Sequence, residues 1–283
     1  MSINWFPGHM VKARREISEN IKLVDIVIEL VDARAPMSTR NPELEKLFAH
    51  KPVLVVLNKM DLVDPDDVKA WIKRLHREKI GAVAVNALNR QGFQAVMKEI
   101  DRLYKPAADA MVERGWRIRP PRVMVVGIPN VGKSTFLNSV VGKKSARTGP
   151  QPGVTRGKQW VRVEGKIDFL DTPGLMWPKV ESPEQGLKLA SLALVGEKAY
   201  DTAEVASFIV RTTLKQNPGA METRYKVDSL SGLNDEQVFE KIALRKGFID
   251  GESPDLQRAV IDVINEYRKG NLLQSALDRP EML

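Results

Sequence analysis

Residues 122–139 constrain the fold of this chain more than any other segment of its 283 residues. They read RVMVVGIPNVGKSTFLNS, which is an apolar run, then the pattern G-x-x-x-x-G-K-[ST], then a helix-forming stretch. Such a loop holds a nucleotide's phosphates when a strand leads into it and a helix begins at its end, because backbone N–H groups and the helix dipole then converge on the anion. We therefore expect an α/β fold with a phosphate site at the end of a strand.

The loop itself supplies most of the expected phosphate contacts. The Lys133 ammonium is expected to contact the β- and γ-phosphates, and the Ser134 hydroxyl is expected to ligate Mg²⁺. The nucleotide-binding residues expected from this loop are Asn130, Val131, Gly132, Lys133, Ser134 and Thr135.

Three more short apolar runs precede the loop, and helical patterns separate them. The runs cover residues 25–32, 52–58 and 81–86, and the helical patterns cover 43–50, 66–78 and 92–104. This alternation is typical of a parallel sheet that helices cover on both faces. The remaining patterns indicate a surface connector over 105–121, a β-hairpin from runs 159–165 and 166–171, and amphipathic helices beyond about residue 180.

A second phosphate motif follows the hairpin, where residues 171–174 read DTPG. This matches D-x-x-G, in which the aspartate, here Asp171, helps to hold Mg²⁺ and the glycine N–H, here Gly174, binds the γ-phosphate. Thr155 is the expected further Mg²⁺ ligand from the polar segment between the two motifs. Thr148 is the alternative, and the spacing to the following strand favours Thr155.

The base-reading motif N-K-x-D comes earlier in the chain. The Asp61 carboxylate can accept hydrogen bonds from the guanine ring N–H and amino group, a pair that adenine cannot offer, so the motif opposes an ATPase. Asn58 is expected to position the loop, and the Lys59 stem is expected to pack over the ring. Asn86 and Ala87 follow the next apolar run and are expected to bring a backbone N–H to the guanine oxygen.

The order of these motifs is rotated. Ordinary GTPases begin with the phosphate loop and end with the base-reading motifs, whereas this chain begins with the base-reading motifs. The rotated order is compatible with the same sheet, because the nucleotide loops lie at one edge of the sheet whichever strand comes first in the chain. We therefore expect a circularly permuted Ras-like P-loop GTPase domain over residues 1–179, with a mostly parallel sheet and helices on both faces. A smaller all-α domain is expected over residues 180–283, entered directly after DTPG.

The rotated order and four segments resemble the bacterial ribosome biogenesis GTPase A family, in the TRAFAC class of GTPases. The segments are WFPGHMVKARRE (5–16), DARAPMSTRNP (32–42), GIPNVGKST (127–135) and LDTPGLMWPK (170–179). The resemblance implies a GTPase that binds GTP and GDP with Mg²⁺ and acts in late assembly of the large (50S) ribosomal subunit. It also implies that the particle stimulates hydrolysis and that the helical domain binds ribosomal RNA (rRNA). The large subunit, its rRNA and its proteins are then the partners.

Hydrolysis needs a group that orients water, and the position after DTPG, where many GTPases carry glutamine, is Leu175. The resemblance implies that His9 takes this role, since a histidine can position or deprotonate water. The alternatives are that His9 packs the N-terminal segment or contacts RNA. The resemblance also points to Asn130 as a K⁺ ligand, with K⁺ standing in for an arginine finger, against an Asn130 that only stabilises its loop.

Charge and composition limit the kinds of binding partner and the cellular compartment that we expect. The net charge of +8 divides into +12 over residues 1–180 and −4 over 181–283, which favours a polyanion such as RNA, although a basic enzyme without such a partner fits the charge equally well. The absence of cysteine excludes disulfides, and three isolated histidines argue against zinc. The N-terminus is unlike a signal peptide and no apolar run approaches about 20 residues. The expected protein is therefore cytoplasmic, without membrane contact, and a monomer is favoured.

Two other functions stay open at this point. Leu175 favours an RNA-binding assembly scaffold in which the nucleotide sets conformation and turnover is incidental, whereas Lys133, Ser134 and Asp171 favour an enzyme. A GTPase acting in tRNA modification is the less favoured alternative, because the sequence contains no visible modification chemistry.

Overall fold

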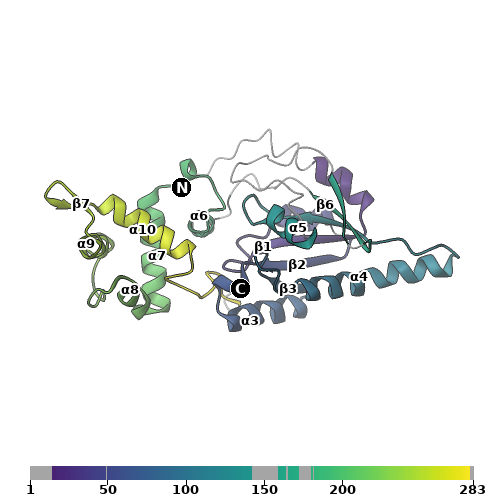
Figure 1. The fold of residues 1–283 in the computed structure, drawn as a ribbon, viewed down its shortest axis with the longest axis horizontal. Coiled ribbons are helices and arrows are strands. Elements are labelled where there is room, and N and C mark those ends of the chain that lie inside the picture. The colour runs from purple at the N-terminus through teal and green to yellow at the C-terminus, as the bar shows by residue number, and fades with distance from the viewer. Residues whose placement is uncertain are drawn as a thin grey trace. The chain divides into compact units, whose positions relative to one another are not determined.

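The computed structural model describes residues 15–48, 50–141, 159–163, 165–171, 180 and 182–280 (Figure 1). These residues form two compact units. The first contains the described residues up to 171 together with residues 278–280, and the second contains those from 180 to 277. Residues 278–280 were expected to belong to the helical domain. They lie on the first unit instead, where Asp278 and Pro280 accept hydrogen bonds.

A six-stranded sheet forms the centre of the first unit. Five strands run parallel, and the edge strand β5 pairs antiparallel with β6 as a hairpin. Every residue of β1 is buried, which requires cover on both faces of the sheet. The parallel sheet and the hairpin predicted from the sequence are confirmed. In spatial order the strands are β3 (Gly81–Val85), β2 (Val53–Asn58), β1 (Ile26–Asp32), β4 (Arg122–Val126), β6 (Ile167–Asp171) and β5 (Gln159–Val163).

Helices between the strands supply that cover. They are α2 (Pro42–Phe48), α3 (Pro65–Arg77), α4 (Phe93–Glu113) and α5 (Lys133–Val141), with the 3-10 helices η1 (Ile21–Leu23) and η2 (Met60–Leu62), and residues 15–20 are also helical. The start of α3 follows from its sequence, because Asp64 caps it by accepting the Asp66 N–H at 2.8 Å and Pro65 needs no N–H partner at the first position. One cluster of the core joins Ile17, Val24, Val27, Phe48, Met124, Val126 and Leu170.

Helix α4 is longer than the sequence analysis expected. The predicted surface connector over 105–121 is wrong in its first half, because the helix continues through Pro106 to Glu113. The chain then returns to the sheet, where the Arg119 guanidinium contacts both oxygens of Asp25 at 2.7 and 2.8 Å. Asp25 also accepts the Arg122 N–H at 2.8 Å, so this pair fixes the point where β4 begins.

The second unit is mainly helical, as predicted. Its helices begin at side-chain caps, including Ser182, Asp201, Asn234 and Asp255, each of which accepts a backbone N–H of the first turn. A short hairpin that the sequence analysis did not predict joins two of the helices. The elements are α6 (Pro183–Ser191), η3 (Glu197–Ala199), α7 (Thr202–Gln216), α8 (Pro218–Tyr225), α9 (Asp235–Lys246), β7 (Ile249–Asp250), β8 (Ser253–Pro254) and α10 (Leu256–Arg268).

Within the described ranges, every helix is too short or too polar to cross a lipid bilayer.

Candidate functional site: three loops at one edge of the sheet

The loops that follow β2, β3 and β4 meet at one edge of the first unit. These strands run in the same direction, so their carboxyl ends lie together although β1 separates β2 from β4. The loop after β2 carries the base-reading motif, the loop after β3 carries Asn86 and Ala87, and the loop after β4 is the phosphate loop. The two groups of motifs, which are far apart in the chain, therefore lie side by side.

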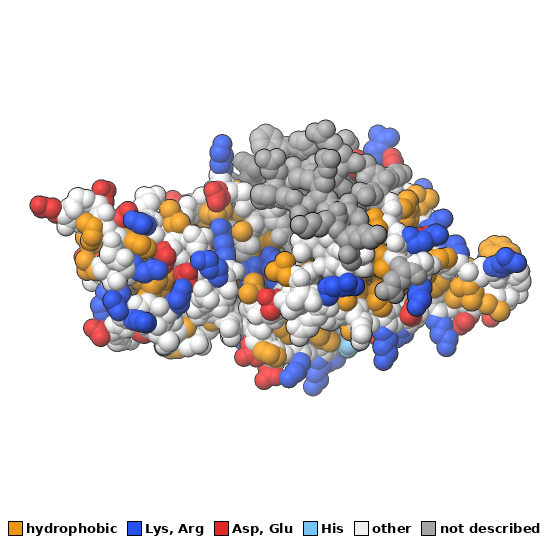
Figure 2. Space-filling view, in the orientation of Figure 1, with side chains coloured by type: hydrophobic (Ala, Val, Ile, Leu, Met, Phe, Trp, Pro, Cys, Tyr) orange, Lys and Arg blue, Asp and Glu red, His pale blue; other side chains and the backbone are white. Residues whose placement is uncertain are grey.

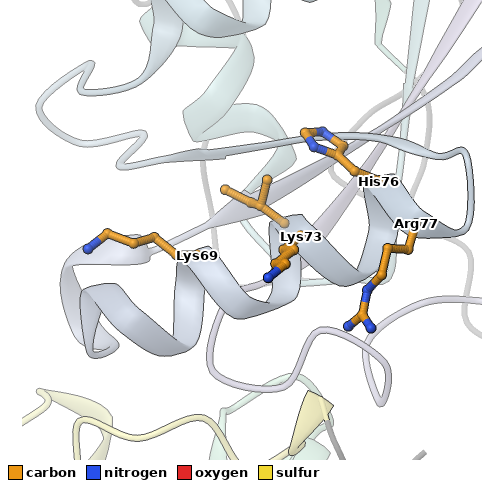
Figure 3. A pocket seen from close by; sticks show the side chains of 5 residues that line it. Lys69, Lys73, His76 and Arg77 are labelled. Carbon is orange, nitrogen blue, oxygen red and sulfur yellow. The ribbon is translucent and has the colours of Figure 1, made fainter.

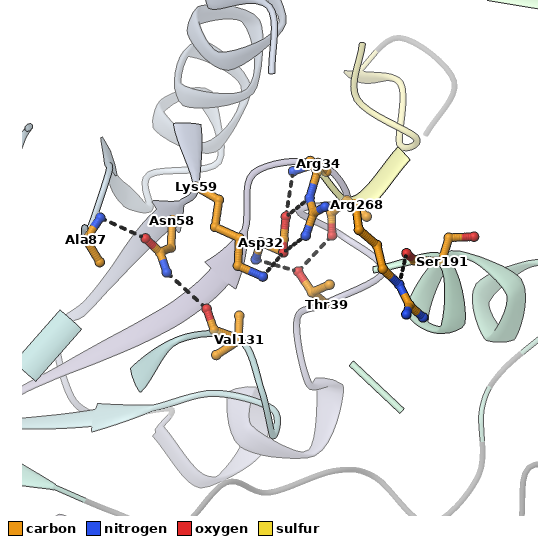
Figure 4. Close-up of polar contacts among 10 residues, drawn as sticks. Asp32, Arg34, Thr39, Asn58, Lys59, Ala87, Val131, Ser191 and Arg268 are labelled. Carbon is orange, nitrogen blue, oxygen red and sulfur yellow. Dashed lines mark hydrogen bonds and ion pairs between the residues drawn. The ribbon is translucent and has the colours of Figure 1, made fainter. Parts of the chain in front are cut away.

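Asn58 joins all three loops through its side chain (Figure 4). Its Nδ2 donates to the Val131 carbonyl at 3.0 Å, and its Oδ1 accepts the Ala87 N–H at 3.2 Å. Both bonds are buried, so removing the amide would leave a backbone donor and a backbone acceptor without these partners. Ser139 of α5 adds a short hydrogen bond to the Ala87 carbonyl. The base side and the phosphate side thus form one rigid assembly.

The phosphate loop needs glycine at two positions with positive φ. A Cβ on Gly127 (φ 155°) would lie 2.5 Å from the Leu30 carbonyl oxygen, and a Cβ on Gly132 (φ 104°) would lie 2.5 Å from Asn58 Nδ2. The loop folds around Lys133, whose buried ammonium donates to the Gly127 and Ile128 carbonyls at 3.1 and 2.9 Å. This backbone cradle at the start of a helix, closed around a lysine, fits the phosphates of a nucleotide.

The base-reading segment turns sharply after Asn58. Lys59 has a left-handed backbone (φ 62°), and the Leu62 N–H donates to the Lys59 carbonyl at 3.0 Å, so Met60, Asp61 and Leu62 form η2. The Asp61 carboxylate is exposed and can be reached by a base. In the loop after β3, which was expected to bring a backbone N–H to the guanine oxygen, the Ala87 N–H donates to Asn58 Oδ1.

Asp32 is a residue of this edge that the sequence analysis missed. It ends β1 beside Asn58 and is fully buried, and its carboxylate accepts the Lys59 ammonium at 2.8 Å. The Arg34 side chain contacts the same carboxylate at 2.8 and 2.9 Å. Burial alone would raise the pKa of the Asp32 carboxyl, but the charges of Arg34 and Lys59 and their hydrogen bonds outweigh it and hold the pKa well below its usual range. The only hint in the sequence was the run DARAP directly after an apolar strand.

The predicted Mg²⁺ and water-positioning residues are only partly described. Ser134 lies half-buried in the first turn of α5, next to Lys133. Asp171 ends β6 in register with Val125, so its backbone lies beside the strand that leads into the phosphate loop. His9, Thr155, Gly174 and the side chain of Asp171 lie outside the described residues. Among the side chains that are described, no group of three or more His, Asp or Glu is arranged to hold a metal.

A separate hollow of about 450 Å³ lies on α3, away from these loops (Figure 3). Its lining is basic, with Lys69, Lys73, His76 and Arg77 around Ile72. Figure 2 shows several Lys and Arg side chains along the edge of this unit that α3 and α4 form.

Comparisons with known proteins agree with this geometry. A family model described as 50S ribosome-binding GTPase matches residues 122–238. The chain is 39% identical over 282 residues to ribosome biogenesis GTPase A of Bacillus cereus, covering 99% of this chain and 95% of that protein. It is 33% identical to mitochondrial ribosome-associated GTPase 1 of Mus musculus, covering 97% and 90% of the two chains.

Among solved structures, the crystal structure of GNP-bound YlqF from T. maritima has the same fold. Its TM-score is 0.66 at 24% sequence identity, and the alignment covers 95% of this chain and 99% of that one. The predicted fold class, a circularly permuted P-loop domain followed by a smaller helical part, is confirmed.

Proposed function

This chain belongs to the ribosome biogenesis GTPase A family and is a GTPase, and on that premise we propose that it acts in late assembly of the large (50S) ribosomal subunit. In this proposal it binds pre-ribosomal particles and their rRNA in the GTP state. Hydrolysis of GTP by water to GDP and phosphate then releases or remodels the protein on the particle. The observation that carries the proposal is the Asn58 side chain, which bonds the base-reading loop to the phosphate loop in the rotated order of this family.

The proposed nucleotide site uses both sets of loops. Asp61 reads guanine and the Lys59 stem covers the ring, while Asn86 and Ala87 shape the loop beside the base. The phosphates lie in the cradle of residues 130–135, where Lys133 would exchange the Gly127 and Ile128 carbonyls for phosphate oxygens. The Gly174 N–H would sense the γ-phosphate.

Two metal ions belong to the proposal. Ser134, Thr155 and Asp171 would hold Mg²⁺, which supplies positive charge to the phosphate oxygens during hydrolysis. The position of Ser134 beside Lys133 and the register of Asp171 with Val125 support this ligand set. Asn130, which has a left-handed backbone (φ 61°) in the phosphate loop, is the proposed K⁺ ligand. His9 is the proposed group that orients the attacking water.

RNA contacts are proposed for both units. The basic lining of the α3 hollow and the positive charge of residues 1–180 support contacts from the first unit to phosphate groups. The second unit has a weakly acidic balance, so its contacts would come from a local basic face, for which Arg258, Arg268 and Lys269 are the candidates. The protein would work as a monomer and also touch ribosomal proteins near its site.

The deciding experiment measures GTP hydrolysis in KCl with and without purified large subunits. We expect strong stimulation by large but not small subunits, less stimulation in NaCl at equal ionic strength, and none for Lys133→Ala. Tight GTP binding without stimulation would instead favour the RNA-binding scaffold, which Leu175 makes the second candidate because it cannot orient water as glutamine does.

A further inference from the structure

The C-terminal residues 278–280 are held on the first unit by several hydrogen bonds. The Trp71 indole N–H donates to the Asp278 carbonyl at 3.1 Å, and Arg74 donates to the Pro280 carbonyl at 2.6 Å. Arg279 lies 3.3 Å from the Asp67 carboxylate. All three of these partners belong to α3, so the tail is fixed along one helix.

The Asp278 side chain makes a further contact of the tail, away from α3. Its two carboxylate oxygens accept the Ser38 N–H and the Ser38 hydroxyl, each at 2.7 Å. Asp278 and Ser38 are only 4% and 8% exposed. A carboxylate this deeply buried makes short, charge-assisted hydrogen bonds that fix the position of the donor.

Ser38 belongs to loop 33–41, which leads from β1 into α2, and this loop is tied to Asp32. The next residue, Thr39, accepts the Asp32 N–H at 3.0 Å and donates to the Ala35 carbonyl at 2.7 Å. Arg34 of the same loop contacts the Asp32 carboxylate with its side chain and with its backbone N–H. The loop therefore sets both the backbone and the side chain of Asp32.

Asp32 in turn holds Lys59, two residues before Asp61 (Figure 4). Polar contacts, linked through the chain between Ser38 and Thr39, thus lead from Asp278 through loop 33–41 and Asp32 to the base-reading segment. None of these groups needs to touch the nucleotide for its placement to affect the base, because a rigid support keeps a recognition group in its productive position.

We propose that Asp278 is a positioning residue for guanine recognition: it fixes loop 33–41, which fixes Asp32 against Lys59 and so aligns Asp61 with the base. This inference rests on the proposed base-binding role of residues 58–61. It extends the recognition machinery to the end of the chain, which reaches this loop only after passing through the second unit.

The test compares GDP with inosine diphosphate in the full-length protein. Inosine diphosphate lacks the amino group of guanine and offers Asp61 one donor in place of two, so the ratio of the two dissociation constants measures alignment of Asp61. For Asp278→Ala we expect the Kd for GDP to rise about fivefold to tenfold and the preference for GDP over inosine diphosphate to shrink. Asp278→Asn, which keeps one acceptor for Ser38, should lie between the wild type and Asp278→Ala.

Glu266→Gln is the matched control. Glu266 is also a buried carboxylate near the C-terminus, 4% exposed and paired with Arg224, Lys269 and Asn271, but it belongs to the second unit. It should lower thermal stability and leave both nucleotide affinities unchanged. An Asp278→Ala protein whose preference for GDP equals that of the wild type overturns the positioning role, whatever its stability.

Asp61→Ala separates this inference from the proposed site. If Asp61→Ala keeps the preference for GDP, the assignment of the base site is wrong. If Asp61→Ala loses the preference and both Asp278 variants keep it, only the positioning role fails.

Discussion

Gly132→Ala tests whether the phosphate loop and the base-reading loop really share one rigid support. The new Cβ would lie 2.5 Å from Asn58 Nδ2, far inside van der Waals contact. Because Asn58 is buried and bonded on both sides, it can move only by giving up its hydrogen bonds to the Val131 carbonyl and the Ala87 N–H. At about 1 kcal/mol for each bond, this displacement costs about 2 kcal/mol.

Backbone strain adds to that cost, because φ at Gly132 is 104°. A non-glycine residue in such a rare region costs about 1–3 kcal/mol. The expected loss in the free energy of unfolding is therefore about 3–5 kcal/mol. Gly165→Ala is the matched control, because Gly165 also has positive φ (70°) but a Cβ there would meet nothing within 4 Å. It should cost about 1–2 kcal/mol.

The measurement is urea unfolding of the nucleotide-free protein, followed by tryptophan fluorescence. The same substitutions are then made in an Asn58→Ala background, where the collision is absent. There the cost of Gly132→Ala should fall by about 2 kcal/mol, whereas the cost of Gly165→Ala should not change. Equal costs of Gly132→Ala in both backgrounds would refute the argument that Asn58 is the obstacle.

Three further predictions concern charge and catalysis. Asp32→Asn should lower the free energy of unfolding at pH 7 by about 3 kcal/mol. Because the pKa of Asp32 is lowered in the fold, the difference in unfolding free energy between the variant and the wild type should shrink as the pH falls below about 4. A constant difference down to pH 3 would contradict this. The double variant Lys73→Glu/Arg77→Glu should bind large subunits at least about tenfold more weakly, with an unchanged Kd for GDP. Lys98→Glu, at an exposed position of α4, should have little effect on subunit binding. Sedimentation with subunits at two salt concentrations measures the binding of both variants. His9→Ala should reduce subunit-stimulated turnover about 100-fold at unchanged GTP affinity, and a normal stimulated rate would reject its role.

The sheet could be predicted from the sequence because each strand can be recognised from its own residues. Each of β1 to β4 is a mostly apolar run, and the order of the motifs alone required the rotated topology. The phosphate loop was equally predictable, because the pattern G-x-x-x-x-G-K-[ST] lies directly between a strand-forming and a helix-forming stretch. In these segments the neighbours in sequence decide the structure, so one sequence is sufficient.

The errors occurred where distant residues decide the structure. Pro106 normally ends a helix, but α4 continues through it, and the Tyr104 hydroxyl near that point donates to the Arg119 carbonyl of the returning chain. Asp32 looked like an ordinary strand end, because its partner Lys59 lies in the turn that follows another strand. Asp278 looked like part of a helical domain, because its partner Ser38 lies 240 positions earlier in the chain.

Among the described residues, two chain connections join the two units. One leaves after DTPG, the segment proposed to sense the γ-phosphate, and the other returns at Asp278, beside the loop that holds Asp32. Under the proposed function, loss of the γ-phosphate would act on the first connection alone, since the base stays bound in GDP. Loss of the whole nucleotide would act on both. Under the proposed function, hydrogen exchange at Ser38 should therefore be the same with GDP and a GTP analogue and faster without nucleotide, whereas exchange in α6, just after DTPG, should already differ between the two nucleotides.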